Sequence, residues 1–215
     1  MTQLHGRIFI ARHGETVFNA AGRMQGQKML HTPLTMRGFA QADEMGRALA
    51  LWLGTNQSLH IWSADTGRAL QTLAVVCEHI GADWHQARVD ARLDEIDVGE
   101  WSGRSYREII AEQGEIMDRE TGLFSVRAPG GESYADVAAR LSSWMADTAQ
   151  EHGDRLVIMH GMSSRVLRGL QRGLPVDPRF GAPIAESLPQ GTLAMVGYED
   201  DEKLICVGTG QGERG

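Results

Sequence analysis

The amino-acid sequence predicts an α/β fold in which helices cover a largely parallel sheet. Two short apolar, β-branched runs, residues 7–11 and 155–159, end abruptly at polar residues, as strands buried on both faces do. Segments with apolar residues at helical spacing separate these runs along the chain. Strands that alternate with helices are typical of a layered α/β domain.

The first half of the chain supplies two strand–helix units. After the strand over 7–11, Thr35 is placed to cap a helix over 36–53, where apolar residues recur at helical spacing (Phe39, Ala42, Met45, Leu49, Trp52). A short strand is expected over 59–62. The polar turn after it leads into a helix that carries Arg68 and ends near Ile80.

The second half is less regular, and residues 115–127 show no clear period. The expected elements are, in chain order, a weak strand (89–96), a Gly-containing loop (99–103), a short helix (106–112), a long amphipathic helix opened by Ser133, a strand (155–159), a helix (163–172) and two strands (191–198 and 203–207). The last two strands are predicted to form a hairpin around residues 199–201.

The composition indicates one domain spanning residues 1–215. The chain is 42% hydrophobic and 23% charged, which is ordinary for a globular protein. Its formal net charge of -7 creates no field that attracts nucleic acid or anionic lipid, so neither is expected as a partner. Any anion-binding site must therefore be a local cluster of positive charge.

Cysteine usage favours a reducing compartment. Cys77 and Cys206 lie far apart and match no metal-ligand spacing, so no metal site is expected. The first residues lack the apolar region of a signal peptide, and no apolar run is long enough to cross a bilayer. We therefore expect a cytoplasmic protein.

Polar residues follow three of the expected strands directly. Arg12-His13 follows the first strand, residues 63–68 follow the second, and His160 follows the strand over 155–159. In a parallel sheet, residues beyond the carboxyl ends of the strands line a common crevice. Arginine and histidine are costly to bury without an anionic partner, for which phosphate and carboxylate are the natural candidates. Taken alone, residues 12–16 fit a solvated strand end equally well.

Six strings of residues, in this order along the chain, resemble the histidine phosphatase superfamily, the phosphoglycerate mutase-like proteins. They are Arg12-His13-Gly14-Glu15-Thr16 with Phe18-Asn19; Gln25-Gly26 with Pro33-Leu34-Thr35; Ser63 with Arg68-Ala69 and Thr72; Leu93, Glu95, Gly99, Trp101 and Gly103; Pro129-Gly130-Gly131-Glu132-Ser133; and His160-Gly161. The resemblance covers nearly the whole chain. It implies a three-layer α/β/α sandwich with a mostly parallel central sheet, and a single histidine phosphatase domain in which residues 104–131 form a lid over the pocket.

The resemblance also implies an activity. The chain is expected to be a histidine acid-type phosphatase, a metal-independent phosphomonoesterase that needs no cofactor and acts on a small phosphorylated metabolite. A phosphate monoester carries nearly two negative charges, which arginine and histidine side chains can neutralise without a metal. Each contact of opposite charges at ~4 Å is worth on the order of 4 kcal/mol before desolvation. The sequence leaves the oligomeric state open, with a homodimer as one alternative.

The matching positions suggest a role for each candidate residue. His13 is the expected nucleophile, which attacks phosphorus to give a phosphohistidine. Arg12 and Arg68 are expected to bind the phosphoryl oxygens in a forked geometry, and His160 to donate to the same oxygens. Glu95 is the candidate general acid, although on local grounds it also fits a solvated acidic turn. The expected substrate-binding residues are Thr16, Asn19, Gln25, Gly26 and Gly161.

Other functions stay open. The string 94–101 resembles the phosphatase branch rather than the mutases, but a phosphoglycerate mutase and a non-catalytic relative that binds a phosphoryl ligand are both alternatives. A serine hydrolase built on Ser163 or Ser164 is disfavoured because the second glycine of a nucleophile elbow is missing. The family pattern is broken at residues 27–32, a loop that contains His31, and at Gln190-Gly191-Thr192; both places leave the substrate undecided.

A second anionic group of the substrate would need its own partner. Arg119 and Arg127, in the expected lid, are candidates, with solvated surface arginines as the alternative.

Overall fold

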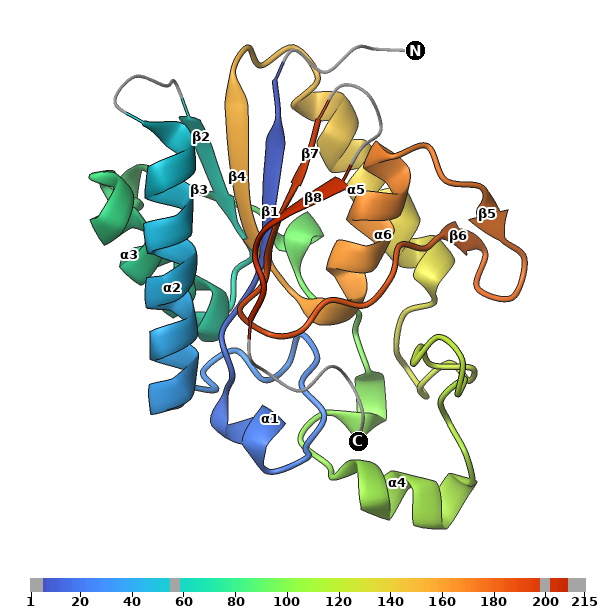
Figure 1. Cartoon of the computed structure of the whole chain (residues 1–215). Coiled ribbons are helices and arrows are strands. Elements are labelled where there is room, and N and C mark those ends of the chain that lie inside the picture. Colours follow the sequence, from blue (N-terminus) through green and yellow to red (C-terminus); the bar gives the residue numbers. More distant parts are fainter. Residues whose placement is uncertain (1–5, 55–58, 198–201, 209–215) are drawn as a thin grey trace.

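A six-stranded sheet forms the middle layer of the protein (Figure 1). The computed structural model describes residues 6–54, 59–197 and 202–208. The strands of the sheet are β1 (Ile8–Arg12), β2 (Leu59–Ser63), β3 (Arg88–Val89), β4 (Asp154–Met159), β7 (Leu193–Val196) and β8 (Glu202–Cys206). Their order is β3-β2-β4-β1-β7-β8. The first four strands in this order run parallel, and β7 and β8 are antiparallel additions at one edge.

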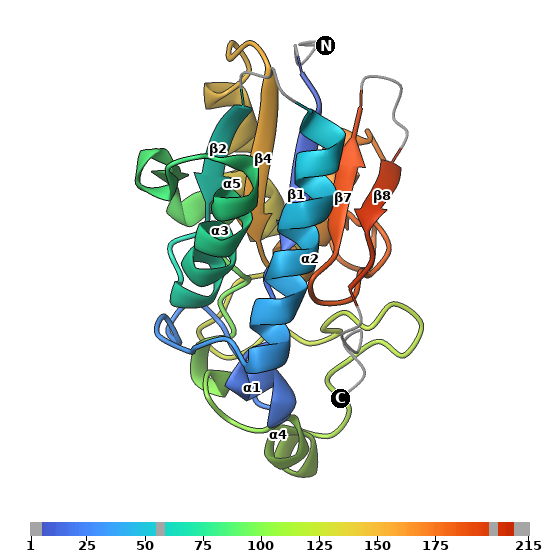
Figure 2. The same ribbon diagram turned by 60° about the vertical axis from the view of Figure 1, so that its left-hand side comes forward.

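Helices cover both faces of this sheet. The helices are α1 (Val17–Ala20), α2 (Met36–Leu53), α3 (Gly67–Ile80), α4 (Tyr106–Gln113), α5 (Tyr134–Asp147) and α6 (Gly161–Gln171). Helices α2 and α3 pack together on one face, and α5 and α6 lie on the other (Figures 1 and 2). The expected three-layer α/β/α architecture with a mostly parallel sheet is confirmed.

The local signals in the sequence explain where the long helices begin. The Thr35 hydroxyl accepts a hydrogen bond from the Gly38 amide at 3.0 Å, which caps α2. Ser133 and Asp136 form a reciprocal capping box at the start of α5. The apolar stripe of α2 faces inward, with Met45 and Leu49 fully buried. The expected bounds of α2 and the start of α5 are confirmed.

Two sequence-based expectations were wrong in detail. The weak strand over 89–96 shrinks to Arg88–Val89, because Asp90 accepts from the Arg92 amide at 2.9 Å and caps a 3₁₀ turn over Ala91–Leu93. Helix α6 begins at Gly161 rather than at Ser163. The expected turn over 199–201 lies outside the described residues.

Smaller elements complete the described chain. They are the 3₁₀ helices Trp84–Gln86 and Gly99–Trp101 and a two-stranded hairpin of β5 (Val176–Asp177) and β6 (Ala182–Pro183). Within the described ranges, none of the helices has the length and apolar character that crossing a bilayer demands.

The carboxyl ends of three parallel strands are bonded directly to one another. The His13 amide donates to the Met159 carbonyl at 3.0 Å, and the Ala64 amide donates to the Ile158 carbonyl at 3.0 Å. The polar residues that follow β1, β2 and β4 are therefore delivered to one place. Helices α1 and α4 lie beyond this same end of the sheet (Figures 1 and 2).

The loop after β1 touches the first turn of α2 so closely that only glycine fits. A Cβ on Gly38 would lie 2.1 Å from the Glu15 carbonyl oxygen, and a Cβ on Gly14 would lie 2.2 Å from the Gly38 carbonyl oxygen. This contact fixes the position of the loop that carries His13.

We expect Gly38→Ala to lower the free energy of unfolding by about 1–3 kcal/mol, because the added methyl group would clash with backbone atoms of Glu15, which cannot rotate away. Chemical denaturation would measure the change. Gly197→Ala is the control, because no atom lies within 4 Å of its added Cβ, and it should stay within about 0.5 kcal/mol of the parent protein. Equal stability of the two variants would contradict the close packing of the loop.

Candidate functional site

A cavity of about 350 Å³ opens beyond the carboxyl ends of β1 and β4. Seven of the ten residues proposed from the sequence line it: Arg12, His13, Asn19, Gln25, Arg68, Glu95 and Gly161. They come from the end of β1 and the residue after it, from α1, from the segment between α1 and α2, from the first turn of α3, from the turn after Leu93 and from the start of α6. Segments far apart in the sequence thus converge on one cavity.

His13 is buried and held in one orientation. Its Nδ1 lies 2.7 Å from the carbonyl oxygen of Gly14, so Nδ1 carries the proton and donates it to that oxygen. The lone pair of the neutral ring is then on Nε2. Burial, followed by the nearby charge of Arg68, holds the pKa of His13 well below its ordinary value. The ring is therefore a neutral imidazole with a nucleophilic nitrogen at neutral pH.

His160 lies against His13, is fully buried and is not among the residues that line the cavity. The two ring centroids are 5.1 Å apart in an edge-on arrangement. Within the part of the chain that the structure describes, neither ring nitrogen of His160 has a hydrogen-bond partner. Burial, followed by the charge of Arg68, lowers the pKa of His160 well below its ordinary value. A buried imidazole with both nitrogens unsatisfied is suited to bind a ligand oxygen.

Arg12 and Arg68 bring two guanidinium groups to the cavity. Arg12 Nη1 donates to the Leu188 carbonyl at 2.7 Å, and Arg68 Nη1 donates to the Met29 carbonyl at 3.0 Å. The Nε and Nη2 atoms of Arg68 are buried without a hydrogen-bond partner among the described residues. Burial lowers the pKa of Arg68 to about 10, and the charges of Glu95 and Asp94 oppose this. The group stays cationic at neutral pH with donors to spare.

The Glu95 carboxylate is attached to the start of α6. Its Oε1 accepts from the amides of Ile96 and Ser163, both at 2.9 Å, and its Oε2 accepts from the Met162 amide at 3.1 Å. These bonds satisfy amides that the first turn of a helix leaves without partners, which explains why α6 starts at Gly161. Of the two interpretations of Glu95, the solvated acidic turn is wrong, because the side chain is buried and borders the cavity.

Asp94, next to Glu95 in the sequence, also has a buried carboxyl. Its Oδ1 accepts from the Asp65 amide at 2.8 Å, and burial raises the pKa of Asp94 to about 6. Asp94 thereby ties the turn after β2 to the segment that carries Glu95.

Thr16 and Gly26 support the cavity from behind and do not line it. The Thr16 hydroxyl lies 2.8 Å from Asn19 Oδ1 and 2.9 Å from Gln25 Oε1, so it ties these two amides together. A Cβ on Gly26 would lie 2.8 Å from a methyl group of Val98. Both residues hold the positions of their neighbours, whereas the sequence suggested direct substrate contact.

The two arginines proposed for a second anionic group do not border the cavity. Arg119 is exposed and pairs with Glu115, and Arg127 pairs with Asp136. Arg23 and Arg37 line the cavity instead, and the charge of Arg37 is neutralised by Glu15 at 2.7 Å. The alternative of surface arginines at 119 and 127 is therefore the better one.

Arg23 is an exposed cationic residue that lines the cavity. Its Nη1 donates to the Gly103 carbonyl at 3.1 Å, and its guanidinium carbon lies 5.9 Å from the Phe18 ring centroid. Within the described chain it forms no ion pair. Arg23 was not predicted from the sequence. The one signal that could have found it is its position two residues before Gln25, within a segment already assigned to the site.

The expected lid segment reaches the cavity through two aromatic residues. Tyr106, at the start of α4, and Phe124 both line it, together with Gln190 from the second place where the family pattern is broken. His31 is exposed and is not among the lining residues. No group of three or more histidine, cysteine or acidic residues suited to a metal ion occurs within residues 6–54, 59–197 and 202–208.

Comparisons with known proteins place these features in a family. The model of the histidine phosphatase superfamily (branch 1) matches residues 8–205. A protein of Salmonella paratyphi C named probable phosphoglycerate mutase GpmB is 34% identical over 172 residues, which cover 79% of this chain and 76% of that protein.

Solved structures of other proteins have a similar fold. A mycobacterial glucosyl-3-phosphoglycerate phosphatase complexed with VO3 superposes with a TM-score of 0.72 at 27% identity, covering 92% of this chain and 96% of that one. An Escherichia coli protein titled putative alpha-ribazole-5'-P phosphatase has the same fold, with a TM-score of 0.70 at 22% identity, covering 94% of this chain and 96% of that one.

The buried histidines make stability depend on pH with a definite sign. Because folding lowers the pKa of His13 and of His160, the unfolded chain binds protons first as the pH falls. Neither group affects stability well above the unfolded pKa of about 6.5. Below it, each lowers the free energy of unfolding by about 1.4 kcal/mol per pH unit.

Urea denaturation between about pH 5 and 6.5 in phosphate-free buffer measures this slope. We expect His13→Asn to flatten the slope by about 1.4 kcal/mol per pH unit, since one buried imidazole no longer titrates. An unchanged slope in that variant would mean that His13 is protonated in the native protein.

Proposed function

The chain belongs to the histidine phosphatase superfamily, and from this premise we propose that it hydrolyses a small phosphate monoester through a phosphohistidine intermediate, without a metal ion. The observation that carries the proposal is the pairing of a neutral His13, with its Nε2 lone pair available, and the unpartnered buried donors of Arg68 and His160. A tetrahedral anion with several acceptor oxygens suits this set of groups. The acid-type subclass is part of the same proposal.

Phosphoryl transfer to His13 is the first step. The Nε2 lone pair forms the N–P bond while the ester P–O bond breaks, and the leaving alkoxide takes a proton from the Glu95 carboxyl. In the second step water attacks phosphorus, the Glu95 carboxylate takes its proton, and the N–P bond breaks. Inorganic phosphate leaves, and His13 returns to its neutral state.

Arg12, Arg68 and His160 act on the phosphoryl group itself. Two guanidinium groups offset the charge that repels a nucleophile, and their forked donors match the phosphoryl oxygens. A histidine that donates to the same oxygens would stabilise charge that builds up in the transition state. Asn19 and Gln25 border the same cavity and would add neutral hydrogen bonds.

The apolar part of the cavity lining suggests the kind of alcohol released. Met24, Val98, Tyr106, Phe124 and Met162 supply apolar and aromatic surface, and Arg23 supplies one positive charge that is not held in an ion pair within the described chain. We propose a substrate whose alcohol portion combines an apolar part with a carboxylate or second phosphate. The similar proteins named for glucosyl-3-phosphoglycerate and alpha-ribazole-5'-P support phosphorylated metabolites as the class.

Phosphoglycerate mutase activity is the second candidate, and it is favoured by the name of the relative that is 34% identical over 79% of this chain. A mutase returns the phosphoryl group of phosphohistidine to a second hydroxyl of the substrate, whereas a phosphatase gives it to water. The resemblance of residues 94–101 to the phosphatase branch supports hydrolysis. A relative that binds a phosphoryl ligand without catalysis is the third alternative.

The setting of the enzyme is also a proposal. Cys77 and Cys206 are free thiols, which supports a reducing, cytoplasmic setting. Size-exclusion chromatography with light scattering would distinguish a monomer from a homodimer.

We expect His13→Ala to lower phosphate release from phosphomonoesters by a factor on the order of 10³ or more, since the nucleophile is lost. Wild-type protein denatured in alkali after a short reaction with ³²P-labelled substrate should carry label on His13, and EDTA should leave the rate unchanged.

A second experiment separates the phosphatase from the mutase. Phosphoglycerate supplied with 2,3-bisphosphoglycerate should yield inorganic phosphate faster than isomerised product. Faster isomerisation would establish the mutase instead, and the absence of label would exclude both activities.

We expect Arg23→Gln to raise the KM for a phosphomonoester that carries a carboxylate by about three- to tenfold, with kcat little changed, because an exposed charge contact is lost. The KM for p-nitrophenyl phosphate should not change. Arg119→Gln is the matched control, because this arginine is exposed and paired with Glu115 outside the cavity. Equal effects of Arg23→Gln on both esters would contradict a role in binding the second anion.

A further inference from the structure

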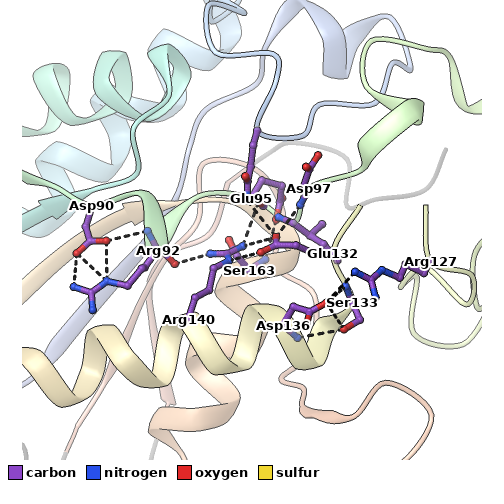
Figure 3. Close-up of polar contacts among 12 residues, drawn as sticks. Asp90, Arg92, Glu95, Asp97, Arg127, Glu132, Ser133, Asp136, Arg140 and Ser163 are labelled. Atoms are coloured by element: carbon purple, nitrogen blue, oxygen red, sulfur yellow. Dashed lines mark hydrogen bonds and ion pairs between the residues drawn. The ribbon is translucent and has the colours of Figure 1, made fainter. Parts of the chain in front are cut away.

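Arg140 of α5 forms a forked ion pair with Glu132 (Figure 3). Its Nε donates to Glu132 Oε1 at 2.9 Å, and its Nη2 donates to Oε2 at 3.1 Å. The Arg140 side chain is 14% exposed and that of Glu132 is 22% exposed, so both charges are largely removed from water. Such a pair has a fixed geometry, because both ends of the fork are engaged.

The same guanidinium also binds the main chain of the segment that carries Glu95. Arg140 Nη1 donates to the Arg92 carbonyl at 2.5 Å, and Nη2 donates to the Glu95 carbonyl at 3.3 Å. One side chain of α5 is therefore bonded to the chain before Glu95 and to Glu95 itself.

Gln27 completes the contact from the loop near the cavity. Its amide nitrogen donates one proton to the Glu95 carbonyl at 3.0 Å and the other to Glu132 Oε2 at 3.1 Å. Glu132 Oε2 also accepts from the Asp97 amide at 2.9 Å. The main chain at Glu95 and two residues beyond it is thus held by one connected network.

The Glu95 carboxylate is held separately, by amides at the start of α6. The network of Gln27, Glu132 and Arg140 fixes the position of the Glu95 main chain, and the amides of α6 fix the position of its carboxylate. None of these three residues is among those that line the cavity.

We infer that Gln27, Glu132 and Arg140 are positioning residues that set the Glu95 carboxyl for proton transfer to the leaving group. The inference rests on the proposed function. Proton donation matters when the leaving group is a basic alkoxide and matters little when it is a stable phenolate. Disturbing the network should therefore slow the hydrolysis of alkyl phosphates more than that of p-nitrophenyl phosphate.

Two variants test this inference, and one control matches them. Gln27→Met removes both donated hydrogen bonds at a half-buried site and leaves no buried charge unpaired. Arg140→Gln breaks the forked ion pair. Arg7→Gln is the control, because Arg7 forms a similar forked pair with Asp154, with Nε 3.1 Å from Oδ2, at the opposite end of β4.

The measurement is kcat/KM for glycerol phosphate and for p-nitrophenyl phosphate, because kcat/KM reports the transfer to His13 and not the later hydrolysis of phosphohistidine, in which Glu95 acts as the base for both esters. General acid catalysis contributes about 10²–10⁴-fold, so we expect Glu95→Gln, the upper limit, to lower kcat/KM in that range on the alkyl ester alone. Gln27→Met and Arg140→Gln should lower the alkyl rate by about tenfold relative to the aryl rate. Arg7→Gln should keep the ratio of the two rates.

Thermal melting separates this effect from loss of fold. Arg140→Gln and Arg7→Gln should lower the melting temperature to a comparable degree, while only the former changes the ratio of rates. Equal losses on both esters in Arg140→Gln and Gln27→Met would overturn the positioning role, and retained hydrolysis of p-nitrophenyl phosphate would leave the phosphatase function standing. An unchanged ratio in both variants would overturn the inference as well.

Discussion

The site depends on nitrogen donors that are buried without an anionic partner. Arg68 keeps two nitrogen atoms, and His160 both ring nitrogens, away from water and without hydrogen bonds in the described chain. Each buried polar atom left without a hydrogen bond costs about 1–3 kcal/mol of stability. An anion with several acceptor oxygens would satisfy these donors together, so the groups that weaken the free protein strengthen its complex with such a ligand. The same burial keeps His13 neutral, which leaves its lone pair available.

The central sheet holds these buried polar groups in place. All five residues of β1 are buried, and β1 lies between β4 and β7. Because His13 and His160 directly follow the paired strands β1 and β4, their rings meet without any adjustable loop between them. Arg68 arrives differently, from the first turn of α3, and its Nη1 is anchored on the Met29 carbonyl. The positions of the charged groups are therefore fixed by backbone pairing rather than by attraction to one another.

Sequence patterns identified what local forces determine. The buried strands and the caps at Thr35 and Ser133 follow from periodicity and side-chain chemistry, and Arg12, His13 and His160 follow from their places at strand ends. The sequence could not show which way a side chain points. Thr16 and Gly26 belong to the right motifs, yet they support the wall, because nonlocal contacts with Gln25 and Val98 decide their orientation. Arg23 and Phe124 border the cavity through packing between distant segments, which no local period encodes.

Helix α6 links the two groups that would handle protons and phosphoryl oxygens. His160 occupies the position just before its first turn, and the Glu95 carboxylate binds the amides of Met162 and Ser163 within that turn. Any displacement of this turn moves both side chains together relative to His13, which directly follows β1. The carboxylate proposed to exchange a proton with the leaving group and the histidine proposed to bind the phosphoryl oxygens therefore share one support, the first turn of α6.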